Sequence, residues 1–242
     1  MAKTIVVDPG HGKHDSGAVG NGMKEKDKAL DISKRIEKKL EAKYDADVRL
    51  TRTGDTYPSL QARCDFANRL NAAAFLSVHL NAGGGTGFES YICAAASTAT
   101  KKYQQNIHKH MAPVLKKYGL KDRGRKVDTQ SARGRIHVLW GTKMKACLVE
   151  VAFIDNAKDA KLLKNSTFLD DVAEALADAI AETVGLKKKG KANPPANSKS
   201  SNLHRVIVDG KQTGAFGVHE NVVNEVSRAI KAGAKKVVVE KV

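Results

Sequence analysis

Long apolar segments are missing from this sequence of 242 residues. No run reaches the roughly 18 apolar residues that a transmembrane helix needs, which excludes membrane insertion by such a helix. The first apolar run, within residues 1–8, is short and a charged residue follows at once, so it does not match a secretory signal peptide. We therefore expect the chain to be made and to fold in the cytoplasm.

Cysteines and aromatic residues are also scarce. The three cysteines, Cys64, Cys93 and Cys147, are odd in number and far apart, so they form neither a disulfide framework nor a paired metal knuckle. We expect three buried thiols. Aromatic residues make up only 5% of the chain, which leaves little material for a surface that stacks the bases of single-stranded nucleic acid.

Positive charge, by contrast, is abundant. The chain has 42 Lys and Arg residues against 26 Asp and Glu, a formal net charge of +16. Such an excess predicts attraction to a polyanion: nucleic acid, anionic lipid or an anionic cell-wall polymer. Residues 187–202 contain five lysines and no acid, and residues 203–242 contain seven basic and four acidic residues. Half of the excess therefore belongs to residues 1–186, and the basicity is not confined to one patch.

The composition divides the chain into three parts. Residues 187–202 consist of Lys, Pro, Asn, Ser, Gly and Ala without hydrophobic periodicity, which is typical of a flexible linker. We therefore predict a large domain over residues 1–186, a flexible basic linker over 187–202 and a small domain over 203–242.

Strand and helix patterns alternate along the large domain. Strands are expected at 4–7, 47–52, 74–80, 87–93 and 146–152, and helices at 26–44, 60–71, 98–118 and 168–184. This alternation predicts an α/β fold with a mainly parallel sheet flanked by helices on both faces. The small domain shows strands at 205–208 and 213–216, a helix at 220–232 and a last strand at 236–239, which predicts a ββαβ unit.

Polar residues near the carboxyl ends of buried parallel strands are candidates for chemistry, because open α/β sheets bind ligands there. His11 follows the first strand, His79 lies near the end of the strand at 74–80, and Glu150 interrupts an otherwise apolar strand. Glu25 begins the first helix. A buried carboxylate such as Glu150 must be paired, bound to metal or functional.

Two histidines and a carboxylate are a common set of protein ligands for a catalytic zinc ion, whose fourth ligand is a water molecule. A further Glu can act as the general base that takes a proton from this water. Structural interpretations stay open for each residue. His11 could be a turn histidine, His79 a satisfied core histidine, and Glu25 an acid that the helix dipole favours at a helix N-terminus. His108 and His110 lie on a Lys-rich helix, where we expect them to be solvated.

The sequence resembles the zinc-dependent N-acetylmuramoyl-L-alanine amidases of the type-3 family. The matching stretches follow the family's order and cover roughly residues 3–185. They are Ile5–Gly12, Asp15–Gly20, Glu25–Asp27, Arg52–Asp55, Arg63 with Ala67–Asn68, Ser77–Ala82, Gly87–Glu89 and Leu148–Ile154. The sequence departs from the family at Ser16, which replaces a usual Pro, and at Ala152, which replaces a frequent Gly.

The resemblance implies hydrolysis of the amide bond between N-acetylmuramic acid and L-alanine in peptidoglycan. It also implies Zn²⁺ ligands at His11, Glu25 and His79, and a catalytic carboxylate at Glu150. Glu89 matches a family position that is usually interpreted as structural or as a support that could orient a ligand. Substrate contacts are expected at Asn81, Arg133, Arg135 and His137.

The small domain is similar to cell-wall-binding modules that follow some phage and bacillus amidases, on the basis of residues 208–216, the helix and the last strand. The expected partners are bacterial peptidoglycan and anionic secondary wall polymers, with no nucleic acid; the sequence leaves the choice between a monomer and a weak dimer through this domain open. A wall hydrolase without an export signal is typical of a phage endolysin released through a holin-type pore, with lysis of a mother cell as the second interpretation.

Two other classes of function remain as alternatives. One is a zinc peptidase that cuts the peptidoglycan stem peptide. The other is a basic nucleic-acid-binding protein, although the sequence has no helix-turn-helix or zinc-finger pattern.

Overall fold

The chain folds into two compact units in the computed structural model, Met1–Lys189 and Gly190–Val242, and each is described here by itself. The structure describes residues 2–132, 134–189, 204–216 and 219–241. Arg133, residues 190–202 of the predicted linker and the first residue of the predicted small domain, Leu203, lie outside the described residues. The first three residues of that linker are described: Lys187 and Lys189 exchange backbone hydrogen bonds with Asp45 and Lys43 at the end of the first helix.

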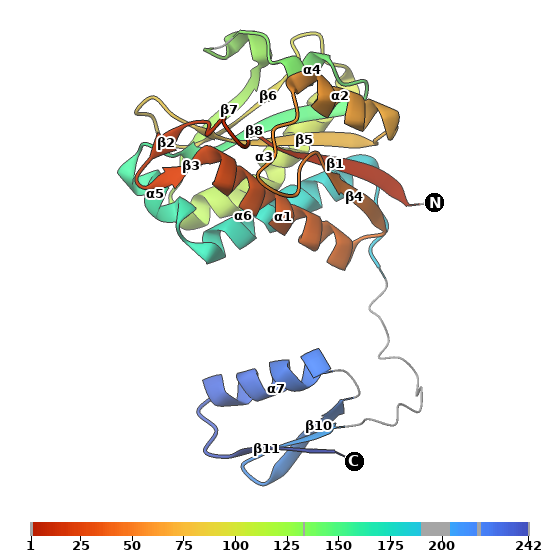
Figure 1. Cartoon of the computed structure of the whole chain (residues 1–242), viewed down its shortest axis with the longest axis vertical. Helices are drawn as coiled ribbons and strands as arrows, with labels where there is room; N and C mark the ends of the chain where they lie inside the picture. Colours follow the sequence, from red (N-terminus) through yellow and green to blue (C-terminus); the bar gives the residue numbers. More distant parts are fainter. Residues whose placement is uncertain (1, 133, 190–203, 217–218, 242) are drawn as a thin grey trace. The chain divides into compact units, whose positions relative to one another are not determined.

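A six-stranded sheet forms the centre of the first unit (Figure 1). Its spatial order is β4 (Ala46–Leu50), β1 (Lys3–Pro9), β5 (Ala74–Asn81), β8 (Lys145–Phe153), β6 (Phe88–Ile92) and β7 (Asp122–Val127). All neighbouring strands are parallel except β6 and β8. The predicted α/β class with a mainly parallel sheet is confirmed.

Helices cover both faces of this sheet, but unequally (Figure 1). Three long helices pack on one face: α1 (Glu25–Lys43), α3 (Thr98–Tyr118) and α6 (Ser166–Val184). The other face carries only α2 (Leu60–Arg69) and the single turn α4 (His137–Trp140). The short helix α5 (Ala157–Leu163) joins β8 to α6, and a 3-10 turn (Asp128–Gln130) follows β7.

The alternation of side chains along β1 explains the two cores. Ile5 and Val7 belong to the large core under α1, α3 and α6, whereas Val6 belongs to the smaller core under α2 and α4. Helix α6 lies between α1 and α3 and is apolar around most of its circumference, because it packs against both of these helices and its buried side chains belong to the large core. Near the carboxyl ends of β5 and β8, the side chains of His79 and Glu150 are only half-buried.

Several elements differ from the sequence prediction. Strand β7, the two-residue strands β2 (Val19–Gly20) and β3 (Met23–Lys24), and helices α4 and α5 were not predicted. Strand β7 is polar because it lies at the edge of the sheet, where its side chains are largely half-buried or exposed. Cys64 and Cys147 are buried as expected, but Cys93 is only partly buried.

The second unit is the predicted ββαβ arrangement. Strands β9 (His204–Val208), β10 (Lys211–Phe216) and β11 (Val237–Lys241) form an antiparallel sheet in the order β10-β9-β11, and α7 (His219–Lys231) precedes β11. Asp209 and Gly210 both have positive φ, 47° and 83°, as a two-residue hairpin turn requires. Among the helices that the structure describes, none combines the length and the apolar character that crossing a bilayer requires.

Candidate metal centre and active site

The loop that follows β1 brings the first donor side chain into position. His11 adopts a left-handed backbone conformation, with φ of 60°, which is uncommon for a residue with a side chain. Gly10 lies against the His79 ring so closely that a Cβ atom there would come within 2.3 Å of His79 Cε1. A Cβ atom at Gly17 would come within 2.6 Å of both Glu25 Oε2 and His11 Cδ2. Both positions therefore require glycine for the donor side chains to converge.

Three donor side chains meet at this point. One donor atom each from His11, Glu25 and His79 lies within 4.8 Å of the other two. Glu25 Oε1 is 3.0 Å from His11 Nε2 and 2.9 Å from His79 Nδ1. The side chains come from the loop after β1, the first turn of α1 and the end of β5, so the sheet assembles them from distant parts of the sequence. Two imidazoles and one carboxylate are a donor set that suits Zn²⁺.

Hydrogen bonds from outside the donor set fix the orientation of these groups. Asp15 Oδ2 lies 2.8 Å from His11 Nδ1, which directs the other ring nitrogen towards Glu25. The Glu25 carboxylate accepts backbone N–H groups of Ala18 at 2.8 Å and Leu80 at 3.0 Å. Asp15 belongs to a motif that sequence analysis recognised, but its supporting role appears only in the fold.

The protonation of the donors follows from these contacts. Burial alone would raise the pKa of Glu25, but the hydrogen bonds and charges of His11 and His79 outweigh it and hold that pKa far below its usual range. Burial lowers the pKa of His11, while Glu25 and Asp15 more than offset this effect and raise it. The Glu25 carboxylate is thus ionised, as a metal ligand must be.

Glu150 lies beside the donor group through the register of the sheet. On β8 it is the Cα partner of His79 on β5, and on the other side it is the Cα partner of Glu89 on β6. Cα partners in neighbouring strands direct their side chains to the same face of the sheet, here the face of α2 and α4. Glu150 itself is half-buried.

Glu89 lies in a buried hydrogen-bond network next to Glu150. Its buried carboxylate accepts hydrogen bonds from Asn81 Nδ2 at 2.7 Å, Tyr91 Oη at 2.8 Å and Arg123 Nε at 2.7 Å, and it also pairs with Lys126. Burial raises the pKa of Glu89, but Lys126, Arg123 and Tyr91 outweigh it and lower the pKa. These four partners do not include a metal-type donor, so Glu89 fixes the Asn81 amide and two cations next to Glu150.

Two buried arginines hold the loop that carries His11. Arg63 on α2 forms an ion pair with Asp8 at 2.7 Å, and both side chains are almost completely buried. Its guanidinium also donates to the carbonyl oxygens of Pro9 at 2.6 Å and His11 at 2.8 Å. Arg52 donates to the carbonyl oxygens of Pro9 and Gly10. The carbonyl groups of this irregular loop therefore have partners although no regular element supplies them.

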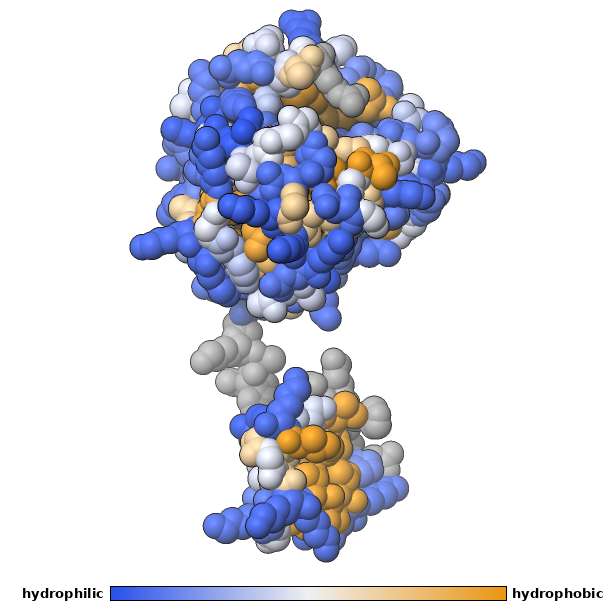
Figure 2. Space-filling model, turned by 90° about the vertical axis from the view of Figure 1, so that its left-hand side faces the viewer, coloured by the Kyte–Doolittle hydropathy of each residue, from blue (hydrophilic) through white to orange (hydrophobic). Residues whose placement is uncertain are grey.

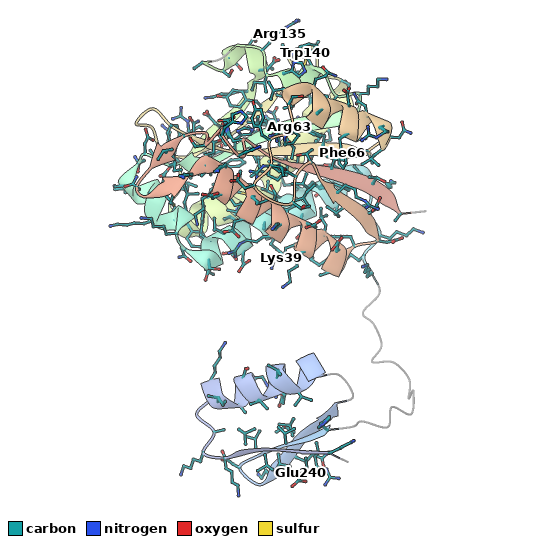
Figure 3. All side chains as sticks on the ribbon, viewed as in Figure 1. Lys39, Arg63, Phe66, Arg135, Trp140 and Glu240 are labelled. Carbon is teal, nitrogen blue, oxygen red and sulfur yellow. The ribbon has the colours of Figure 1, made fainter. Side chains whose placement is uncertain are left out.

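Two other predicted substrate residues, Arg135 and His137, lie at or just before α4 (Figure 3), whereas Arg133 lies outside the described residues. Arg135 is exposed, and His137 Nε2 lies 3.1 Å from Gln61 Oε1 on α2. The His137 ring packs against Trp140 with centroids 4.7 Å apart, and Trp140 is 50% exposed. Trp140 was missed by the sequence analysis; as the only tryptophan in the chain, it was a signal that could have been used.

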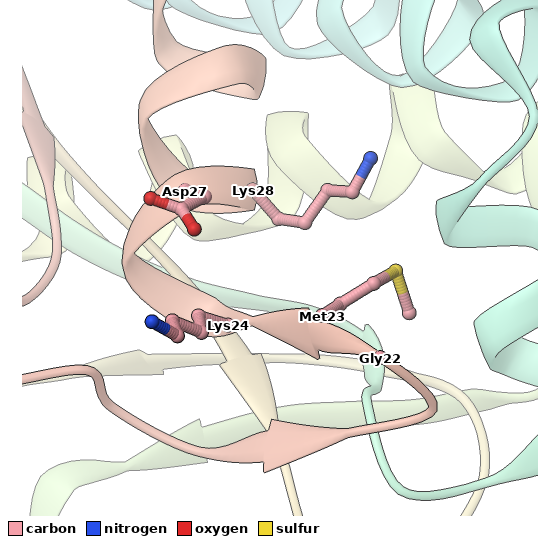
Figure 4. Close-up of a pocket in the computed structure, with 5 residues that line it drawn as sticks. All are labelled: Gly22, Met23, Lys24, Asp27 and Lys28. Atoms are coloured by element: carbon pink, nitrogen blue, oxygen red, sulfur yellow. The ribbon is translucent and has the colours of Figure 1, made fainter.

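A separate shallow pocket lies by the β2–β3 hairpin and the first turn of α1 (Figure 4). It is lined by Gly22, Met23, Lys24, Asp27 and Lys28. Its lining contains none of the three donor side chains, although Glu25 lies between two lining residues in the sequence. This pocket is therefore distinct from the donor group.

The prediction that His108 is solvated is wrong. Its ring is largely buried, with Nε2 2.7 Å from Ser90 Oγ and Nδ1 near Asp122. The ring packs on Phe88, because the Lys-rich helix α3 turns this position towards β6 and β7. His110, by contrast, lies on the outer side of α3, where it pairs with Glu182.

An α/β sheet with two imidazoles and a carboxylate converging at its carboxyl edge defines a candidate metallohydrolase. The sequence profile described as N-acetylmuramoyl-L-alanine amidase matches residues 5–182, and the chain belongs to this family.

Relatives and solved structures agree with this membership. The chain is 42% identical over 225 residues to an endolysin of Bacillus phage SPP1, covering 90% of this chain and 81% of the relative. It is 38% identical over 238 residues to a sporulation-specific N-acetylmuramoyl-L-alanine amidase of Bacillus subtilis (strain 168), covering 98% and 84%. The catalytic domain of the amidase CwlV from Bacillus (Paenibacillus) polymyxa var. colistinus matches with 36% identity and a TM-score of 0.69, over 76% of this chain and 99% of that one.

The chain is therefore an N-acetylmuramoyl-L-alanine amidase that hydrolyses the bond between N-acetylmuramic acid and L-alanine in peptidoglycan. This confirms the activity expected from the sequence resemblance. The family match and the relatives favour neither of the two alternatives, a stem-peptide peptidase and a nucleic-acid-binding protein.

The Arg63–Asp8 pair gives a prediction about stability. The change Arg63→Ala leaves the buried Asp8 carboxylate without its cation, so the free energy of unfolding should fall by about 3–5 kcal/mol. Urea unfolding of the full chain measures this change. Arg69→Ala, at an exposed position of the same helix, is the matched control and should stay within about 0.5 kcal/mol of the parent chain. Equal effects of the two changes would contradict the role of the pair.

Proposed function

We propose that His11, Glu25 and His79 bind one Zn²⁺ ion and that Glu150 is the catalytic carboxylate of the amidase. The observation that carries this proposal is the convergence of three donor atoms within 4.8 Å, with Glu150 in register beside His79. A bound zinc ion would supply Lewis acidity towards the amide carbonyl of the substrate.

The chain's own groups account for the remaining chemistry. Glu150 takes a proton from the attacking water and later gives a proton to the leaving amine nitrogen of L-alanine. Asp15 holds the His11 ring by its Nδ1 atom, and the N–H groups of Ala18 and Leu80 hold the Glu25 carboxylate. Glu89 positions the Asn81 amide, and Arg123 and Lys126 beside it supply positive charge for the carboxylates of the stem peptide.

The longer substrate requires contacts beyond the reacting bond. We assign these to Asn81 near Glu150 and to Arg135 and His137 at α4, together with Arg133 from the sequence pattern. Trp140 adds an exposed aromatic face next to His137, and aromatic faces suit the apolar faces of sugar rings.

We assign a different role to each part of the chain. Residues 1–186 perform catalysis, residues 187–202 link, and residues 203–242 bind the cell wall. The net charge of +16 favours retention on a wall that carries anionic secondary polymers. The likeness to a phage endolysin supports action as a lysin on the cell wall, after synthesis in the host cytoplasm and release through a holin-type pore.

Lysis of a mother cell is the second candidate role. The relative that supports it is named sporulation-specific, and its alignment covers 98% of this chain. Expression timing decides between the two roles: transcription only during phage induction fits the lysin, and transcription only during sporulation fits the mother-cell role.

The bond cleaved provides the direct test of the reaction. Purified cell walls are digested with the full chain, and the products are identified by mass spectrometry. We expect new free amino termini on L-alanine, with intact glycan strands and intact peptide cross-links. New termini within the stem peptide would contradict the amidase assignment.

The change Glu150→Gln separates catalysis from metal binding. Because Glu150 is assigned to proton transfer and not to the metal, the variant should keep its zinc while its turnover falls by about 10²–10⁴-fold. Metal analysis of the purified protein and release of L-alanine termini measure the two effects. Glu182→Gln, at a surface ion pair on α6, serves as control and should keep both. Near-normal turnover of Glu150→Gln would remove Glu150 from the mechanism.

The change His79→Ala tests the donor set. Removing one of three ligands should abolish both bound zinc and activity, and a chelator should have the same effect on the parent chain. His14→Ala is the matched control, since His14 is an exposed imidazole three residues from His11. Stoichiometric zinc in His79→Ala would overturn the ligand assignment.

A further inference from the structure

Two cations share one buried carboxylate at the edge of the sheet. Arg123 Nε lies 2.7 Å from Glu89 Oε2, and Lys126 pairs with the same oxygen. Each cation also lies over an aromatic ring: Arg123 is 4.8 Å from the centroid of Phe153, and Lys126 is 5.7 Å from the centroid of Tyr91. Within this group of three charged residues, the carboxylate balances one cation, so a second anionic group would balance the other.

Both cations remain accessible to a ligand. The Arg123 side chain is 30% exposed and that of Lys126 is 25% exposed, whereas Glu89 is 3% exposed. Arg52 and Arg63, on the β4 and β1 side of the sheet, are buried and donate to carbonyl oxygens of the loop after β1. Arg123 and Lys126, unlike these two arginines, can therefore meet a substrate. Hydrophilic side chains cover most of the surface of this unit on the side that Figure 2 shows, which suits a polar, charged ligand more than an apolar one.

A β-bulge places both cations on the same face of β7. In a regular strand, residues three positions apart, such as Arg123 and Lys126, point to opposite faces. Here Glu89 on β6 stands opposite two residues of β7, Arg123 and Gly124, and Gly124 has a φ of 90°. The extra residue turns Lys126 back to the face of Arg123, while the adjacent Arg125 points to the other face. Bulges of this kind redirect side chains next to active sites.

The spacing of the strands sets the distance between the donor group and the two cations. Glu89 is the Cα partner of Glu150, which is in turn the Cα partner of His79. Neighbouring strands are about 4.8 Å apart, so the Glu89 backbone lies about 5 Å from that of Glu150 and about 10 Å from that of His79. In the substrate, the second stem residue ends within about 7 Å of the cleaved amide nitrogen, because an extended residue spans at most about 3.6 Å. A group on the second stem residue therefore reaches the cations while the cleaved bond lies at the donor group.

We propose that Arg123 and Lys126 bind the α-carboxylate of the second stem residue, and that the enzyme prefers stem peptides in which this group is free. That residue is a glutamate joined through its side-chain carboxyl group, so its α-carboxyl group is either an anion or, after amidation, a neutral amide. The anion accepts charge-assisted hydrogen bonds from both cations, and the amide makes weaker ones. The proposal rests on the donor group and Glu150 as the reaction centre, and it assigns the peptide side of the substrate to β6 and β7.

A comparison of two soluble substrates provides the test and needs no variant. Both are disaccharides that carry a stem tetrapeptide, and they differ only in whether the α-carboxyl group of the second stem residue is free or amidated. With the full chain, we expect kcat/KM for the free carboxylate to exceed that for the amide by about 10–100-fold, the range of a hydrogen bond to a charged group. Chromatography measures the rate of peptide release, and mass spectrometry identifies the free amino terminus of L-alanine.

The change Lys126→Gln assigns the preference to this site. We expect kcat/KM to fall about tenfold on the free carboxylate and to stay within about twofold of the parent value on the amide. Arg123 still pairs with Glu89 in this variant, so the buried carboxylate keeps a cation. Lys126→Arg retains the charge and should retain the preference. Arg125→Gln, on the other face of the same strand, is the matched control and should keep both parent values.

Two results would overturn the proposal. One is an equal kcat/KM of the parent chain for the two substrates, and the other is a Lys126→Gln variant that keeps the parent's ratio. The proposed reaction centre fails in a different way: Glu150→Gln would then cleave both substrates as fast as the parent does, whatever their ratio. The two failures are therefore distinguishable in the same assay.

Discussion

The buried ion pair between Asp8 and Arg63 is the interaction on which the geometry of the donor group His11, Glu25 and His79 depends. It lies where β1 ends and the chain must leave the sheet in an irregular loop. The Arg63 guanidinium donates hydrogen bonds to the Asp8 carboxylate and to the carbonyl oxygens of Pro9 and His11. The Arg52 guanidinium donates to the carbonyl oxygens of Pro9 and Gly10. Removing two charges from water is costly, so the pair is tolerated because almost every donor and acceptor has a partner. What the pair provides is a fixed, left-handed backbone at His11.

The rest of the donor group is built on this fixed loop. Glycine at position 10 lets the loop touch the His79 ring, and the backbone N–H groups of Ala18 and Leu80 hold the Glu25 carboxylate from two different segments. Glu150 is then placed by sheet register alone, one strand away from His79. The backbone therefore constrains the position of each of these side chains. Such restricted positions are what catalysis and metal binding require.

Sequence patterns predicted helices and strands well where the hydrophobic periodicity was strong. They predicted less well where the position of an element in the fold determines which of its residues are buried. The strands and helices around His11, Glu25, His79 and Glu150 lie within a few residues of the predicted bounds. Strand β7 was missed because an edge strand need not be apolar, and His108 was expected in solvent because lysines surround it in the sequence. Glu89 was expected in a structural or supporting role, and only the fold shows that its partners are Asn81, Tyr91 and two cations.

By itself, the sequence determined the α/β class, the family and the residues that form the donor group, because hydrophobic periodicity and motif order are properties of the linear chain. Tertiary structure alone decided which groups support them: Asp15 behind His11, Arg63 under the loop, and Asn81 beside Glu89. It also decided that Trp140, Val223 and Ile230 are exposed. The physical reason is that hydrogen-bond partners and exposure arise from contacts between residues far apart in the sequence, and no local pattern records those contacts.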